Sequence, residues 1–342
     1  MSRPLVSVIM IFLDAERFIE EAIASVVAQS WPHWELLLVD DGSRDGSTAI
    51  ARAWAKRQPE RVRYLEHPGH ANRGMSAARN LGLAHARGEL VAFLDADDVF
   101  LPERLARHVA LLARHPEVDM VQSRYEIWYS WQKEGSRLDD DHVGPSIEPY
   151  DRILAPPLCL ALMLAVPAIA PGTCNVTLRR EAVQAAGGFD ESFRGLFEDQ
   201  VFFARVYLRS TVLVIPDVLA RYRRHAEACT RRQRGDEVAA ARLAFLRRLE
   251  QDLDAAEPGE AGALEPVRRW LASEREALVR PARRLRHRLL PFANDLLLSA
   301  MPARAYLGLV RLRRMREERL VSRRVAEVLA TAPPRLVGEA QP

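Results

Sequence analysis

Three carboxylates follow an apolar run in the segment "LVAFLDADDV", which covers residues 90–99 and contains Asp95, Asp97 and Asp98. Carboxylates this close repel one another and are costly to desolvate, so such a group commonly holds a cation or accepts hydrogen bonds from a ligand. Mg²⁺ and Mn²⁺ take oxygen ligands from one or two carboxylates and from substrate phosphates. A solvated acidic turn is the alternative, and we expect Asp98 to cap the following helix rather than to bind a metal.

A second acidic pair, Glu198 and Asp199, lies in "GLFEDQVFFARVYLR". The spacing of Val201, Phe202 and Val206 predicts a helix with an apolar inner face. Acidic residues at a helix N-terminus are favoured by the helix dipole, which gives the pair a structural explanation. From the local sequence alone, a structural role and a functional role of the pair both stay open.

Strand-like and helix-like segments alternate over the first 130 residues. Strand-like segments occupy residues 5–13, 34–43, 62–67 and 89–98, and each precedes a stretch of helical periodicity. This repetition predicts an α/β fold with a mostly parallel sheet covered by helices on both faces. Ligands bind beyond the carboxyl ends of such strands, where Asp14, "DDGS" (residues 40–43) and "DADD" (residues 95–98) fall.

One long apolar stretch, Ile153–Pro171, carries no charge. A helix needs about 20 apolar residues to cross a bilayer. Prolines interrupt this stretch and leave only residues 158–166 as continuous helix, so we expect a short buried helix. The apolar N-terminal run is too short to span a membrane and lacks a signal-peptide cleavage site, so we expect it to be the first buried strand.

The three cysteines, Cys159, Cys174 and Cys229, form an odd and scattered set. Their number and spacing favour neither a disulfide framework nor a zinc site. The expected compartment is therefore the reducing cytoplasm.

Positive charge gathers near the C-terminus. Fourteen arginines and four acidic residues lie between Arg275 and Arg324, a local net charge of +10 in a chain whose total is +3. Pro281, Pro291 and Pro302 are expected to divide this basic, apolar region into short helices. Such segments either lie on anionic membrane surfaces or pack on their own domain. No aromatic-interleaved binding motif accompanies the arginines, so no nucleic acid is expected as a partner.

Three blocks together resemble the successive signatures of the family 2 glycosyltransferases, which have the GT-A fold. The blocks are "VSVIMIFLDAERFIEEAIASVVAQSWPHWELLLVDDGSRDGST", "NRGMSAARNLGLAHARGELVAFLDADD" and "GGFDESFRGLFEDQVFFAR". The resemblance covers about residues 4–230, and it implies a Rossmann-like sheet domain over residues 1–232. Residues 233–342 resemble no family, and their sequence pattern predicts a mainly helical, Arg-rich region. It also implies an inverting transferase that moves a sugar from a nucleoside diphosphate, most commonly uridine diphosphate, to an acceptor hydroxyl.

The resemblance assigns roles to the acids that follow the strands. Asp40 and Asp41 correspond to acids that recognise the nucleoside, and Arg79 in "AARNLG" corresponds to an arginine near the nucleotide. Asp95 is expected to face the ribose or the metal, and Asp97 to bind Mg²⁺ or Mn²⁺. A helix-surface position is the alternative for Arg79.

The segment after the first strand departs from the family pattern. Members commonly read Pro-Val-Tyr-Asn where this chain has Ile11, Phe12, Leu13 and Asp14. The aromatic residue is displaced by one position and the polar residue is an acid. Phe12 and Asp14 are expected at the nucleotide, and a base would stack poorly on Leu13.

The resemblance also names the reacting groups. Asp199 corresponds to the catalytic base that takes the proton of the acceptor hydroxyl, with Glu198 fixing the acceptor and the helix. His225, in "YRRHAEACT", corresponds to a polar position near the diphosphate and the metal, although a solvated loop histidine is an equal alternative. Trp128 and Trp131 could stack on a sugar ring, but a place in a hairpin is preferred.

The expected partners are a nucleotide-sugar donor and a glycan or lipid-linked acceptor of the bacterial surface. The expected location is the cytoplasm, with the basic C-terminal region at the inner face of the plasma membrane. A non-catalytic nucleotide-sugar-binding scaffold of the same fold is the alternative, and the presence of every signature acid argues against it. A phosphoacceptor receiver domain also pairs acids after a strand, but this chain lacks its later lysine and is far too long.

Overall fold

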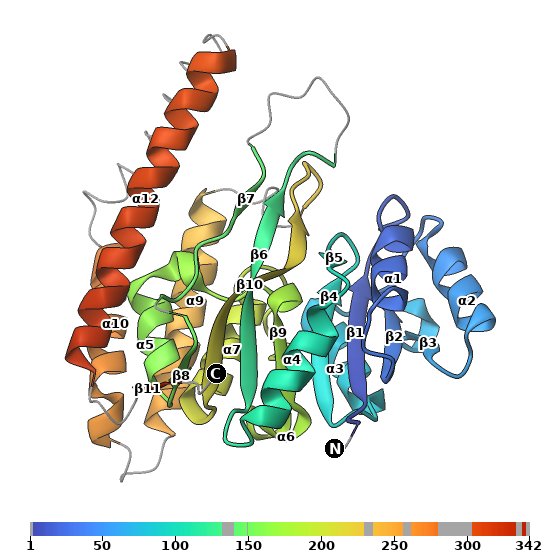
Figure 1. Ribbon diagram of the computed structural model, residues 1–342, viewed down its shortest axis with the longest axis horizontal. Helices are drawn as coiled ribbons and strands as arrows, with labels where there is room; N and C mark the ends of the chain where they lie inside the picture. Colours follow the sequence, from blue (N-terminus) through green and yellow to red (C-terminus); the bar gives the residue numbers. More distant parts are fainter. Residues whose placement is uncertain are drawn as a thin grey trace.

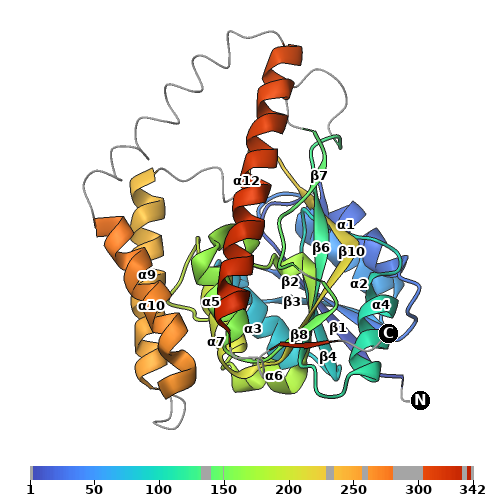
Figure 2. The same cartoon turned by 60° about the vertical axis from the view of Figure 1, so that its left-hand side comes forward.

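The computed structural model of the chain is built around one large sheet with helices on both faces (Figures 1 and 2). It describes residues 3–131, 140–148, 150–228, 235–255, 261–279, 303–332 and 337–339. Within these residues eleven strands form the sheet, in the order β11-β8-β10-β6-β9-β4-β1-β2-β3, with β5 paired to β10 and β7 paired to β6.

The strands and helices of the first 130 residues follow the predicted alternation, apart from one additional short strand. The strands are β1 (Val6–Phe12), β2 (Trp34–Asp40), β3 (Val62–Glu66), β4 (Leu90–Asp95), β5 (Val99–Phe100), β6 (Met120–Trp128), β7 (His142–Val143), β8 (Arg152–Leu154), β9 (Val176–Arg179) and β10 (Val212–Arg223). The helices are α1 (Ile19–Val27), α2 (Ser47–Arg57), α3 (Met75–His85), α4 (Arg104–Arg114), α5 (Leu158–Ala165), α6 (Arg180–Ala185) and α7 (Glu198–Arg209). The later elements are α9 (Gly235–Asp254), α10 (Ala261–Val279), α12 (Ala303–Thr331) and β11 (Val337–Glu339).

Most strands of the sheet run in one direction, as predicted, although the central strand β9 runs in the opposite direction. Strand β1 pairs in parallel with both β2 and β4, and β2 pairs in parallel with β3. Strand β9 is antiparallel to both β4 and β6, so β6 and its parallel neighbour β10 run in the same direction as β4. The carboxyl ends of β1, β2 and β4 therefore meet at one edge of the sheet.

Alternate side chains of the strands enter two separate cores. Ile9, Val39 and Phe93 face a layer that includes α3, α5, α7 and α9. Val8 and Leu38 face the opposite layer, which includes α1, α2 and α4. The period of two explains this division, and burial of both faces explains why the strands are apolar along their length.

The uncharged stretch after Ile153 contains the predicted short helix. All eight residues of α5, from Leu158 to Ala165, are buried. No helix in the described part of the chain is both long and apolar enough to cross a membrane.

The helices that follow residue 232 pack on the sheet domain. Leu246 of α9, Val267 of α10 and Val328 of α12 are buried in the same core as α5 and α7. Strand β11 pairs with β8 at the end of the sheet. The division into 1–232 and 233–342 stays a prediction, because the two regions share a core.

Helix α12 corrects the expectation for the C-terminal region. Short helices were expected after Pro302, but α12 is a single helix of 29 residues. Proline is tolerated just before a helix, and no further proline occurs between Ala303 and Thr331, so nothing ends the helix earlier. One end of α12 lies beside α5 and β8, where Arg324 donates to the carbonyl of Ala165, and the rest projects beyond α9 and α10 (Figure 2). The basic segment of residues 280–302 lies outside the described residues.

Candidate active site

The carboxyl edge of the sheet brings several predicted site residues into register. Phe12 at the end of β1 lies opposite Asp40 of β2, and Ile11 lies opposite Asp95 of β4. The acids that the sequence places after separate strands are therefore neighbours in space.

Asp40 organises the turn that follows β2. Its carboxylate is completely buried and accepts hydrogen bonds from the N–H groups of Gly42 (3.1 Å) and Ser43 (2.8 Å). The hydroxyls of Tyr64 (3.1 Å) and Thr48 also donate to it. These four donors explain how a buried carboxylate is stabilised here, and nucleoside recognition by Asp40 stays a prediction.

Asp41 holds the loop before α3. Its carboxylate accepts the N–H groups of Arg73 at 2.7 Å and Gly74 at 3.0 Å. Burial raises the pKa of Asp41, although these two bonds oppose the shift. Asp41 therefore joins the β2 edge to the start of α3, and its predicted contact with the nucleoside stays a prediction.

The loop after β1 lies against the same turn. Asp14, with a φ of 51°, accepts the N–H of Arg44 at 2.6 Å and donates its own N–H to Ser43 at 3.1 Å. Phe12 is only 4% exposed and belongs to the core, whereas the next residue, Leu13, is 46% exposed. The side chain that this loop presents at the edge is thus Leu13, and a role for Phe12 at the nucleotide stays a prediction.

Arg79 joins the two acidic motifs. It lies on α3 and is 2% exposed, so the helix-surface alternative is wrong. Its Nη2 donates to Asp95 Oδ1 at 2.7 Å and its Nη1 to Glu198 Oε1 at 2.5 Å. Thr173 donates to the other oxygen of Asp95 at 3.2 Å. Burial opposes the charge of Arg79, but the two carboxylates outweigh it and raise its pKa.

The second acidic pair begins α7, as predicted. Glu198 is 3% exposed, and burial raises its pKa to about 7 against the opposing effect of Arg79. Asp199 accepts the N–H of Gln200 at 2.8 Å. Burial also raises the pKa of Asp199. Its carboxylate therefore keeps capacity to accept a proton or a further hydrogen bond.

Asp97 meets His225, which lies just after β10. The two side chains are joined by a contact of 2.9 Å between Nε2 and Oδ2. His225 is 8% exposed and packs on Phe18, so the solvated-loop alternative is wrong. Its Nδ1 has no hydrogen-bond partner among the described residues.

These two side chains fit a divalent cation only in part. The Asp97 carboxylate suits Mn²⁺ or Mg²⁺, whereas the His225 nitrogen suits Mn²⁺ better than Mg²⁺, and a substrate and water would supply the remaining ligands. Within the described part of the chain, no group of three or more His, Cys, Asp or Glu side chains could hold a metal by itself. The cation would therefore depend on a bound diphosphate.

Asp98 corrects one prediction. It was expected to cap the following helix, but strand β5 intervenes and α4 begins only at Arg104. Asp98 is 1% exposed and accepts the N–H of Arg223 at 3.0 Å. Burial, with Asp97 and Asp95 close by, raises its pKa well above the ordinary value.

The two predicted tryptophans lie where the hairpin interpretation placed them. Trp128 ends β6, which pairs with β7, and residues 132–139 of the connection lie outside the described residues. Trp131 donates to the carbonyl of Arg224 at 3.0 Å and packs edge-on against Phe18. Sequence reasoning missed Arg223, which lies between these rings and the Asp97 turn. Its only signal was its place two residues before His225.

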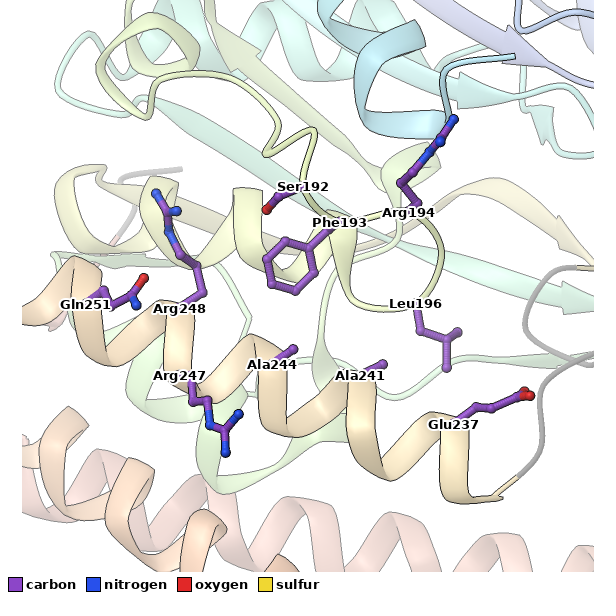
Figure 3. Close-up of a pocket in the computed structure, with 10 residues that line it drawn as sticks. All are labelled: Ser192, Phe193, Arg194, Leu196, Glu237, Ala241, Ala244, Arg247, Arg248 and Gln251. Carbon is purple, nitrogen blue, oxygen red and sulfur yellow. The ribbon is translucent and has the colours of Figure 1, made fainter.

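A pocket of about 600 Å³ lies beside the loop that leads into α7 (Figure 3). The loop lines one side and α9 the other, and Phe193 points toward α9 in this view. The loop also reaches the opposite side, because Ser76 donates to the carbonyl of Phe193 and Arg194 donates to that of Asn72. The pocket therefore adjoins the segment that carries Glu198 and Asp199. Its lining residues are Ser192, Phe193, Arg194, Leu196, Glu237, Ala241, Ala244, Arg247, Arg248 and Gln251.

Comparison with known proteins agrees with this geometry. Residues 7–153 match the family model described as Glycosyl transferase family 2. One curated relative is WfgD of Escherichia coli, named as a UDP-Glc:α-D-GlcNAc-diphosphoundecaprenol β-1,3-glucosyltransferase, which is 32% identical over 123 residues. That alignment covers 36% of this chain and 46% of WfgD. Matches to other curated relatives cover between 33% and 66% of their length, for example 52% and 62% of two Bacillus subtilis proteins.

Solved structures establish the GT-A fold. Residues 1–349 of Staphylococcus aureus TarS in complex with UDP superpose with a TM-score of 0.59 at 20% identity, over 94% of this chain and 91% of that one. The mannosyltransferase PcManGT of Pyrobaculum calidifontis, in complex with GDP-Man and Mn²⁺, gives 0.55 at 20% identity, over 96% and 86%. The fold class predicted from the sequence is confirmed.

Proposed function

We propose that this chain is an inverting glycosyltransferase that uses a nucleoside diphosphate sugar, with uridine diphosphate as the carrier. The observation that carries the proposal is the Arg79 bridge, since it brings the Asp95 motif and the Glu198 motif into one site. The donor side then comprises Phe12, Asp14, Asp40, Asp41, Arg79 and Asp95.

In the proposed reaction, Asp199 is the general base. It removes the proton of the acceptor hydroxyl while that oxygen attacks the anomeric carbon of the donor. A new glycosidic bond forms as the bond to the diphosphate breaks, and the electron pair leaves with the diphosphate. One displacement inverts the anomeric configuration.

Asp97 and His225 lie on the leaving-group side of this proposal. A divalent cation held there, Mg²⁺ or Mn²⁺, would neutralise the charge that develops on the diphosphate. The solved structure of PcManGT is a complex with GDP-Man and Mn²⁺, which supports this choice.

The acceptor is proposed to be a glycan or a lipid-linked glycan of the bacterial surface. The name of WfgD, which includes a diphosphoundecaprenol-linked acceptor, supports a lipid-linked substrate. The pocket between the loop of residues 192–196 and α9 is a suitable place for part of it, because this loop leads directly to Asp199. The exposed arginines of α12 would hold the protein at the inner face of the plasma membrane, where such a substrate is presented.

A nucleotide-release assay tests the proposal. UDP-Glc, UDP-GlcNAc and GDP-Man would be offered singly, with Mn²⁺ or with EDTA, and thermal unfolding would be followed in parallel. A donor at about 100 times its Kd should add roughly 2.7 kcal/mol of stability. Metal-dependent release from a uridine donor, with inversion in the NMR spectrum of the product, is the expected result. Binding without turnover across donors and acceptors would favour a scaffold instead.

A further inference from the structure

Arg223, the last residue of β10, holds the turn that carries Asp97. Its side chain is 3% exposed. Its Nε donates to the backbone carbonyl of Asp97 at 2.7 Å, and its backbone N–H donates to Asp98 Oδ1 at 3.0 Å. The backbone carbonyl of Asp97 and the carboxylate of Asp98 are therefore both hydrogen-bonded to Arg223.

The guanidinium of Arg223 is itself held from several sides. Nη2 donates to Glu21 Oε2 of α1 at 2.6 Å. The rings of Trp128, Trp131 and Phe18 lie 4.4, 4.9 and 5.2 Å from the guanidinium carbon. A planar cation that stacks on aromatic faces and donates in a fixed fork has little freedom to move.

This arrangement determines where the Asp97 carboxylate lies. Asp97 sits inside a tight turn, in which the Asp98 N–H donates to the carbonyl of Asp95 at 3.0 Å. Arg223 fixes the main chain of that turn, and His225, two residues further along, contacts the Asp97 carboxylate. The main chain and the side chain of Asp97 are thus both set by the segment of residues 223–225.

We propose that Arg223 is a positioning residue that presets the Asp97–His225 pair for a divalent cation. This inference rests on the proposed function, in which those two side chains bind the metal. Arg223 acts through its bonds to the Asp97 turn and touches neither cation nor substrate. Groups that orient metal ligands in this way typically change metal affinity by about 10- to 100-fold when they are replaced.

The test measures Mn²⁺ binding directly. Free Mn²⁺ would be followed by electron paramagnetic resonance during titration of the full chain in the presence of UDP. Arg223→Met removes the fork, and Arg223→Lys keeps the charge but cannot stack and donate in the same geometry. Both variants should bind Mn²⁺ at least tenfold more weakly, while the affinity for UDP measured in EDTA should change less than twofold.

Arg221→Met is the matched control. Arg221 lies on the same strand and pairs with Glu126 at 2.8 Å, and its side chain is 41% exposed. This variant should bind Mn²⁺ as the wild type does. Glu21→Ala is a second variant, at an exposed position of α1. It removes the bond between Glu21 and the Arg223 guanidinium, and it should weaken Mn²⁺ binding two- to threefold.

The outcomes separate this inference from the proposed function. A wild-type protein that binds no Mn²⁺ with UDP would remove the proposed metal site itself. Wild-type binding together with unchanged binding in both Arg223 variants would overturn the positioning role alone. If the Arg223 variants unfold, Glu21→Ala decides, because unchanged Mn²⁺ affinity in that folded variant contradicts the proposal.

Discussion

Arg79 Nη2 lies 2.7 Å from Asp95 Oδ1, and this ion pair joins α3 to the carboxyl end of β4. The second nitrogen of the same guanidinium reaches Glu198 at the start of α7, 119 residues further along the chain. One buried arginine therefore connects the two acidic motifs that the proposed reaction requires. Removal of Arg79 would leave the carboxylates of Asp95 and Glu198 close together without a counter-charge.

Replacing Arg79 should destabilise the protein strongly. Arg79→Gln leaves buried Glu198 without its cation, and breaking a buried pair from one side typically costs about 3–5 kcal/mol. Urea unfolding at neutral pH measures the loss. The double variant Arg79→Gln/Glu198→Gln should lose less than the sum of the single variants, because it leaves no uncompensated charge there. Strictly additive losses would contradict the bridge, and the exposed Arg87→Gln serves as control.

The raised pKa of Glu198 predicts a pH dependence of stability. Burial moves this pKa from 4.5 to about 7. The folded protein then keeps a proton that the unfolded chain has lost, so the contribution is fully present below the unfolded value and is lost as the pH rises toward 7. The shift corresponds to about 3 kcal/mol at most.

Glu198→Gln has no such ionisation. The free energy of unfolding of this variant, relative to that of the wild type, should therefore increase by up to about 3 kcal/mol between pH 4.5 and pH 8. Urea titrations at several pH values would measure this difference in the free energy of unfolding. Glu117→Gln, which replaces an exposed carboxylate, is the control. A constant difference would mean that Glu198 does not titrate in this window.

The sequence predicted the features that depend on neighbouring residues better than those that depend on contacts between distant parts of the chain. The apolar runs within residues 5–13 and 89–98 are local features, so they predicted the existence of β1 and β4, although the second segment extends three residues beyond the end of β4. Because β1, β2 and β4 are parallel, their carboxyl ends meet at one edge of the sheet, and Asp40 and Asp95 lie together there. The helix that begins at Glu198 likewise follows from nearby apolar spacing.

The bonds that complete the site come from distant segments. The sequence around Asp98 is typical of a helix cap. In the structure its carboxylate instead accepts a hydrogen bond from the backbone N–H of Arg223 in β10. His225 meets Asp97 across 128 positions, and no local pattern distinguishes this histidine from one in a loop. Arg223 and Arg224 are adjacent arginines, and contacts with distant segments distinguish Arg223, which packs on Trp128 and donates to the carbonyl of Asp97.

Asp97→Asn should abolish metal-dependent donor binding. The substitution keeps the shape of the side chain but removes the negative charge that faces His225. Donor affinity measured with Mn²⁺ should fall to the level measured in EDTA, and turnover should fall with it. Asp217→Asn, on β10 and paired with Arg107, is the control. An Asp97 variant that still responds to Mn²⁺ would place the cation elsewhere.

Asp199→Asn should separate catalysis from binding. A positioned general base contributes about 10²- to 10⁴-fold to the rate, so transfer should fall by this factor. Donor and metal affinity should stay near the wild-type values, because the base faces the acceptor. Calorimetric titration of the donor and a transfer assay, with the exposed Glu191→Gln as control, distinguish the two effects. Loss of donor affinity would move Asp199 into the nucleotide site, and near wild-type transfer would exclude it as the base.

The exposed face of α12 predicts binding to anionic vesicles. Deleting the chain from residue 280 is not a clean test, because Val325 and Val328 of this helix are buried in the core. Replacing Arg316 and Arg319 with serine leaves that contact intact, since both side chains are exposed. Each arginine near an anionic surface is worth about 1 kcal/mol, so the double variant should bind such vesicles roughly 30-fold more weakly at low salt.

The control replaces Arg268 and Arg275 of α10, which already pair with Asp254 and Glu250. Co-sedimentation with vesicles of anionic and of neutral lipid measures both variants, and a wild-type protein that ignores anionic vesicles at low salt would exclude membrane binding through this helix.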